Sequence, residues 1–219
     1  VDLEGSHRAI EIAERTEGVF AIVGQHPNAA QHYSASILGE YEIMLAHPKV
    51  VALGEIGLDY YRDHATPDQQ KRCLNDHLDL AEAKGVSVVF HCREAYCDLL
   101  ALLESRKYTG DILFHCFAGS HEDAVRAMRM SNCMFGVNGP ITYPRADELR
   151  ATIAKIPRDC IVLETDSPYL SPVPHRGKPN HPAFVPLIAA GLAKVWECDS
   201  GEVARVTTAN ALRFFRLMS

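Results

Sequence analysis

The sequence has no stretch that approaches the roughly 18 to 20 unbroken apolar residues of a membrane-spanning helix. Its opening residues, VDLEGSHRAI, also lack the basic start and apolar core of a secretory signal. We therefore expect a cytoplasmic protein with no membrane partner. The chain has no low-complexity tract, and no linker rich in Pro, Gly or Ser before residue 170. A single domain over 1–219 is predicted.

The seven cysteines form no C-x-x-C pair, and their odd number argues against a secreted disulfide framework. They are expected to be reduced and mostly buried. The chain also lacks an excess of positive charge, because its formal net charge is −6. Broad basic surfaces supply most non-specific affinity for nucleic acids, so this class of binding is disfavoured. A phosphate-bearing substrate would need help from bound cations.

What the sequence does contain is a repeated pairing of short β-branched runs with helix-like segments. Six such runs are found, at 19–25, 50–54, 86–90, 112–114, 133–137 and 160–163. One intervening helix is clearly marked: Thr66 and Pro67 suit its first positions, Leu74 and Leu78 share a face, and Gly85 ends it. The runs are apolar in both directions, which predicts parallel strands covered on both faces by helices.

Polar, coordinating residues follow nearly every run, and this separates the two parallel α/β architectures. An open sheet concentrates its site at one switch point, whereas a TIM-like (β/α) barrel gathers residues from many strand ends into one mouth. The pattern therefore predicts a TIM-like barrel of which six of eight units are visible. The residues at the strand ends are His26, Glu55, His91, His115, Asn138 and Asp166.

Two carboxylates and two imidazoles in this set suggest a metal site. Glu55, His91, His115 and Asp166 would suit divalent Zn, Mn, Co or Fe, with Mg also possible. Each alone has a simpler explanation: a strand-end histidine is usually packed, Glu55 could pair with Arg93, and Asp166 could cap a turn. Four such residues at equivalent places in a repeating unit favour the metal interpretation.

Further residues near the strand ends are candidates for substrate binding. Aromatic rings, guanidinium groups and polar side chains there could stack on bases or pair with phosphates. The stretch 171–182, with four prolines and a glycine, could line the site or be an ordinary connection. The candidates are His26, Asp59, Tyr60, Arg62, Arg93, Asn138 and Arg176.

The joint set of motifs resembles the TatD family of metal-dependent deoxyribonucleases. The motifs are GEIGLDYYRD, the H-C-R-E-A block, F-H-C-F-A-G-S, G-V-N-G-P-I-T-Y, L-E-T-D-S-P-Y-L and T-T-A-N-A-x-R-F-F. The resemblance runs from about residue 3 to residue 216. It implies an amidohydrolase-type TIM barrel, two divalent metal ions (Mg, Mn or Zn) and hydrolysis of DNA phosphodiester bonds, typically as an exonuclease on single strands.

The resemblance also implies roles for individual residues. Glu55 looks like the ligand shared by both metals, His91 and His115 like ligands of one metal, and Asp166 like a ligand that also takes the proton from the attacking water. His26 matches the G-x-H-P motif, but Asn28 stands where the family usually has a second histidine. His77 likewise stands where the family usually has Gln.

The family's first strand ends in an H-x-H pair, and none of the 11 histidines here forms one. We therefore expect about two β-α units to be absent from the chain, which also falls short of the ~250 residues typical of these barrels. Open sheet edges would favour a homo-oligomer. We expect this chain to hold one ion or none, and to have weak activity.

Three functions remain in competition on the sequence alone. The first is a metal-dependent hydrolase of DNA, acting on single strands. The second keeps the metals but cleaves an amide, lactone or aminoacyl ester, because fold does not fix function. The third is an inactive homologue with a scaffold or interaction role.

Overall fold

The computed structural model describes residues 2–130 and 132–217. Contacts divide the chain into two compact units, Val1–Phe114 with Met130–Asn132, and His115–Arg129 with Cys133–Ser219. Every strand pair described within a unit is parallel, as predicted. No helix among the described residues is both long and apolar enough to cross a membrane.

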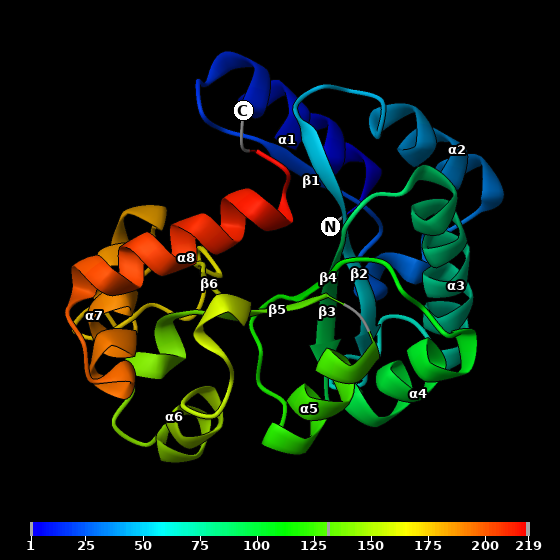
Figure 1. The fold of residues 1–219 in the computed structure, drawn as a ribbon. Helices are drawn as coiled ribbons and strands as arrows, with labels where there is room; N and C mark the ends of the chain where they lie inside the picture. The colour runs from blue at the N-terminus through cyan, green and yellow to red at the C-terminus, as the bar shows by residue number, and fades with distance from the viewer. Residues whose placement is uncertain (1, 131, 218–219) are drawn as a thin grey trace. The chain divides into compact units, whose positions relative to one another are not determined.

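In the first unit, four parallel strands lie side by side in chain order (Figure 1). They are β1 (Ala21–Val23), β2 (Val50–Asp59), β3 (Val88–Arg93) and β4 (Ile112–Phe114). The helices are α1 (Leu3–Arg15), α2 (Ala35–Met44), α3 (Pro67–Lys84) and α4 (Tyr96–Arg106), with a 3-10 helix η1 (Pro27–His32) after β1. All four strands fall on predicted apolar runs.

Strand β2 is longer than the sequence predicts, because it continues past residue 54 to Asp59. Its pairing with β3 is irregular between Gly54 and Ile56, which places Glu55 at a bulge inside the strand. Pairing then resumes, and Gly57 lies opposite His91. A Cβ atom at Gly57 would sit 2.0 Å from the carbonyl oxygen of His91, and φ there is +143°, so only glycine allows this close approach.

Helix α3 begins and ends where the sequence predicts. Thr66 caps it, with its hydroxyl accepting from Gln69 N at 3.3 Å while Gln69 Oε1 accepts from Thr66 N at 2.8 Å. This reciprocal pair satisfies backbone groups that the first turn would otherwise leave free. Gly85 ends the helix in a left-handed conformation. The predicted apolar face is buried, since Leu74 and Leu78 are at most 1% exposed.

The second unit contains a parallel pair of strands and the remaining helices. Its elements are α5 (His121–Met130), β5 (Cys133–Val137), η2 (Gly139–Thr142), α6 (Asp147–Ile153), η3 (Arg158–Cys160), β6 (Ile161–Leu163), η4 (Pro182–Phe184), α7 (Val185–Trp196) and α8 (Ser200–Phe214). Helices α7 and α8 pack together (Figure 1). Asn210 of α8 donates from Nδ2 to the carbonyl oxygens of Arg158 and Ile161, which fixes α8 against β6.

The strands supply the core of each unit. All five residues of β5 are buried, and Phe90 of β3 and Phe114 of β4 pack ring to ring in the first unit. Each fully buried side chain of this size contributes about 1.5–3 kcal/mol of transfer free energy. Burial on both faces is the property that the apolar runs predicted. All seven cysteines are free thiols, three of them buried.

Candidate metal centre

In the first unit, the imidazole of His91 lies between two carboxylates. Its Nε2 is 3.0 Å from Oδ2 of Asp59, and its Nδ1 is 3.8 Å from Oε1 of Glu55. A carboxylate only accepts hydrogen bonds when ionised, so Nε2–H donates to Asp59. In the neutral ring, that bond leaves the Nδ1 lone pair directed toward Glu55, which is the arrangement a metal-ligating histidine needs.

Asp59 is 1% exposed, and its carboxylate accepts hydrogen bonds from several donors within the protein. Besides His91, it accepts from Nδ2 of Asn28 at 3.2 Å and from the backbone N–H groups of Tyr61 and Arg62 at 3.0 and 3.1 Å. Burial by itself would raise the pKa of Asp59, but these hydrogen bonds outweigh it and hold the pKa below its usual value. Asp59 is therefore a fixed anion that orients His91.

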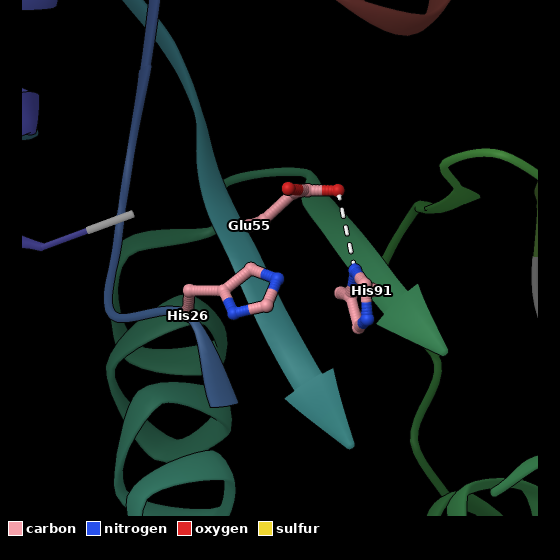
Figure 2. Close-up of side chains that lie close together, drawn as sticks. All are labelled: His26, Glu55 and His91. Carbon is pink, nitrogen blue, oxygen red and sulfur yellow. Dashed lines mark ion pairs between the residues drawn. The ribbon is translucent and has the colours of Figure 1, made fainter. Parts of the chain in front are cut away.

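His26 completes a cluster with Glu55 and His91 (Figure 2). One ligand atom from each of the three residues lies within 4.8 Å of the others. Burial, with repulsion from His91, lowers the pKa of His26 to about 4, so the ring is neutral near pH 7. Its Nδ1 accepts from the backbone N–H of Asn28 at 3.1 Å. The other ring nitrogen is turned toward His91 (Figure 2).

The donor set of the first unit fits a divalent ion. Two bonds of about 2.1 Å to one ion place the ligand atoms about 3 to 4 Å apart. The 3.8 Å between His91 Nδ1 and Glu55 Oε1 lies within that range. His26 would join after a small side-chain adjustment, or would instead donate Nε2–H to a substrate because Nδ1 already accepts a hydrogen bond.

The second unit repeats the same arrangement around His115, which follows β4. Its Nδ1 donates to Oε2 of Glu164 at 2.5 Å, and its Nε2 lies 3.4 Å from Oδ1 of Asp166. The other oxygen of Glu164 accepts from the backbone N–H of Cys116 at 2.6 Å. Again one carboxylate holds a histidine nitrogen while the other nitrogen faces a second carboxylate at a distance that one ion could span.

The predicted ligands are therefore found as two pairs, Glu55 with His91 and His115 with Asp166, each within its own unit. The expectation that all four share neighbouring ions stays a prediction. The sequence placed Glu55 and His91 after their strands, and this was wrong. Both lie inside strands, β2 and β3, because pairing between the two strands continues to Asp59 and Arg93.

The other predicted substrate residues of the first unit have varied surroundings. Tyr60 donates its hydroxyl to Asp98 at 2.8 Å, so the side chain is held by the protein. Arg62 and Arg93 are exposed, and both guanidinium groups lie over the ring of Tyr61. Their contact with a substrate, and that of Asp59, stay predictions.

In the second unit, Asn138 and Arg176 also stay predictions as substrate residues. Asn138 is 5% exposed, and its Nδ2 has no hydrogen-bond partner within residues 2–130 and 132–217. A buried donor of this kind is costly unless something binds it. Arg176, in the proline-rich stretch, lies 4.5 Å over the ring of Tyr143.

Sequence reasoning missed Glu164 and the orienting role of Asp59. Glu164 stands two residues before Asp166, and in a strand-like segment alternate residues share a face. That spacing was the available signal. For Asp59 no local signal exists, because a carboxylate at a strand end can face either solvent or a neighbouring histidine.

Comparisons with known proteins agree with this geometry. The family model described as "TatD related DNase" matches residues 1–216. The chain belongs to the TatD family. It is 37% identical to the uncharacterized metal-dependent hydrolase YabD of Bacillus subtilis, over 96% of this chain and 82% of that protein. It is 36% identical to the 3'-5' ssDNA/RNA exonuclease TatD of Cronobacter turicensis, over 97% and 83%.

The solved structures confirm the predicted fold class. The TatD homologue YJJV of Escherichia coli K12 superposes with a TM-score of 0.90 at 31% identity, over 97% of this chain and 83% of that chain. The TIM-like α/β architecture expected from the strand pattern is thus the TatD architecture. The protein is a TatD-family metal-dependent hydrolase.

Proposed function

We propose that this TatD-family protein is a divalent-metal-dependent exonuclease that removes nucleotides from single-stranded DNA or RNA. The observation that carries the proposal is the cluster of His26, Glu55 and His91, in which imidazole and carboxylate atoms converge as metal ligands do. Relatives at similar identity named as 3'-5' ssDNA/RNA exonucleases, from Cronobacter turicensis and Musicola paradisiaca, supply the substrate class.

Four residues would hold metal: Glu55 and His91 from the first unit, and His115 and Asp166 from the second. A divalent ion bound at either pair would supply Lewis-acid stabilisation of charge on a phosphoryl group and would acidify water. Asp59 and Glu164 keep the two histidines in the required tautomer. Asp166 is the proposed proton acceptor for the attacking water, because its carboxylate is only partly buried and lies beside His115.

Other residues would bind the nucleic acid. His26, neutral at pH 7, can donate Nε2–H to a phosphate oxygen. The Nδ2 group of Asn138 is a donor of the same kind in the second unit. Arg62, Arg93 and Arg176 supply charge-assisted hydrogen bonds to phosphates, which matter in a chain whose overall charge is negative.

The test compares cleavage of a 3'-labelled single-stranded oligonucleotide with cleavage of simple ester and amide substrates. Chelation should abolish release of nucleotides from the 3' end, and adding back Mn²⁺, Mg²⁺ or Zn²⁺ should restore it. Glu55→Gln should lower the rate by at least about 100-fold, since a metal ligand is lost. Glu42→Gln, an exposed change on α2, is the matched control and should leave the rate unchanged.

Two outcomes would contradict the proposal. Metal-dependent cleavage of the ester or amide with no attack on the oligonucleotide would favour the alternative hydrolase. No activity on any substrate, with the Glu55→Gln protein indistinguishable from the unchanged one in metal binding, would favour the inactive homologue.

A further inference from the structure

The turn that follows β2 gathers two guanidinium groups on one aromatic ring. Cζ of Arg93 lies 3.6 Å from the centre of the Tyr61 ring, and Cζ of Arg62 lies 5.3 Å from it. Tyr61 is 52% exposed. A guanidinium held flat against a ring keeps its N–H edge free to donate to an anion.

Among the residues that the structure describes, these two cations have no anionic partner. Within residues 2–130 and 132–217, neither Arg62 nor Arg93 takes part in an ion pair, whereas Arg106, Arg150 and Arg158 each do. The chain carries 28 acidic and 22 basic residues, so acidic partners are plentiful. Two adjacent unpaired guanidinium groups on an exposed ring therefore indicate a surface that meets an external anion.

The ring and the metal centre are fixed by the same carboxylate. Oδ1 of Asp59 accepts from the backbone N–H groups of Tyr61 and Arg62, and Oδ2 accepts from Nε2 of His91. The backbone N–H of Tyr60 donates to the carbonyl oxygen of Arg93 at 2.9 Å, which ties the turn to the end of β3. The backbone that carries the ring is thus held at the carboxyl ends of β2 and β3, rather than on a free loop.

We propose that Tyr61, Arg62 and Arg93 form a nucleotide-binding platform, in which the exposed ring stacks on a base of a single strand and the two guanidinium groups bind its phosphates. The proposal rests on the proposed function for its substrate class. Stacking on an aromatic ring tolerates any base, and single-strand binding proteins combine such rings with basic groups that follow the backbone. The platform would hold a nucleotide next to the one being cleaved.

The decisive experiment measures binding with metal removed, so that cleavage cannot occur. Fluorescence anisotropy would compare a labelled oligothymidylate with an abasic strand of the same number of phosphates, each in EDTA. The unchanged protein should bind the thymidylate at least about fivefold more tightly, the lower range for one stacked base. Tyr61→Ala should remove this preference and leave affinity for the abasic strand nearly unchanged.

Two control variants separate stacking from a general effect. Tyr61→Phe keeps the ring and should keep the preference for bases. Phe20→Ala removes a second partly exposed ring that also lies under a cation, Lys49, at 5.2 Å. Phe20 precedes β1, at the opposite end of the parallel strands from Tyr61, so this change should leave both affinities unaltered.

The arginines are tested by salt dependence. Arg93→Gln and Arg62→Gln should each weaken binding of both strands, and each should reduce the slope of log affinity against log salt by about 0.7, the value for one phosphate contact on a single strand. An unchanged slope in both variants would overturn the phosphate part of the proposal.

Equal losses for thymidylate and abasic strands in Tyr61→Ala, or no loss for either, would overturn the stacking part. These results are distinct from failure of the proposed function. If the protein binds single strands as described but cleaves none after metal is restored, the platform proposal stands and the proposed exonuclease function is contradicted.

Discussion

Asp59 and Glu164 illustrate how the site is organised at the scale of single residues. Each holds one nitrogen of a histidine, and the opposite nitrogen is left to face a second carboxylate at 3.8 Å in the first unit and 3.4 Å in the second. Neither residue needs to touch an ion. Partners of this kind fix the ring orientation and the tautomer, and they raise the basicity of the ligand nitrogen.

Replacing Asp59 by Asn tests this role. The amide keeps the shape but can present an N–H to His91, which would favour the wrong tautomer. Metal affinity should fall about 10- to 100-fold, as measured by competition with a coloured chelator. The matched control is Asp63→Asn, an exposed carboxylate in the loop that follows β2. Unaltered metal affinity in Asp59→Asn would remove the orienting role.

The residue-scale features could be predicted only in part. Glu55, His91, His115 and Asp166 were recognisable because carboxylates and imidazoles recur at equivalent places in a repeating pattern. The hydrogen-bond partner of each histidine could not be predicted from the sequence. For His91, the choice between Asp59 and Glu55 as acceptor depends on side-chain geometry across two strands. The pairing of His115 with Glu164 could not be predicted either, because the two residues are 49 positions apart in the sequence.

At the scale of elements, the sequence predicts where strands begin more reliably than where they end. Apolar β-branched runs mark all six strands, and Thr66 and Gly85 mark both ends of α3. The end of β2 is hidden, because Glu55, Gly57 and Asp59 interrupt the apolar pattern although backbone pairing with β3 continues. When functional polar residues lie inside a strand, the hydrophobic pattern therefore fails to predict where the strand ends.

The Thr66 cap provides a prediction for one element. Thr66→Ala removes the acceptor for Gln69 N and the reciprocal pair, so the free energy of unfolding should fall by about 1 kcal/mol. Urea denaturation would measure it. Thr66→Ser keeps the hydroxyl and should stay within a few tenths of a kcal/mol of the unchanged protein. Equal stability of the Ala and Ser variants would contradict the capping role.

At the scale of the whole molecule, one buried histidine connects global stability to pH. His77 on α3 is fully buried, and its Nδ1–H donates to the carbonyl oxygen of Cys73 at 2.8 Å. Burial lowers its pKa to about 4, although the bond to Cys73 acts in the opposite direction. The unfolded chain, with an ordinary histidine pKa of about 6.5, therefore binds more protons between the two values.

Stability from His77 is fully present above about pH 6.5 and is lost as pH falls toward 4. Between about pH 7.5 and about pH 5, this group alone should cost about 2 kcal/mol of unfolding free energy. His77→Gln should reduce the loss on acidification by about that amount in urea denaturation at the two pH values. His7→Gln, at an exposed position, should leave the pH dependence unchanged, and an equal effect of both variants would contradict the assignment.

The close contact of Gly57 with His91 links the spacing of β2 and β3 to the geometry of the candidate metal centre. No atom of Gly57 is a ligand, yet any side chain there would push the two backbones apart and separate the partners that flank the imidazole. Substitutions on the platform could change which ligand is bound, but the position of Gly57 admits no other residue. The freedom of the fold to acquire new substrates therefore lies in its turns, while the spacing of its central strands is fixed.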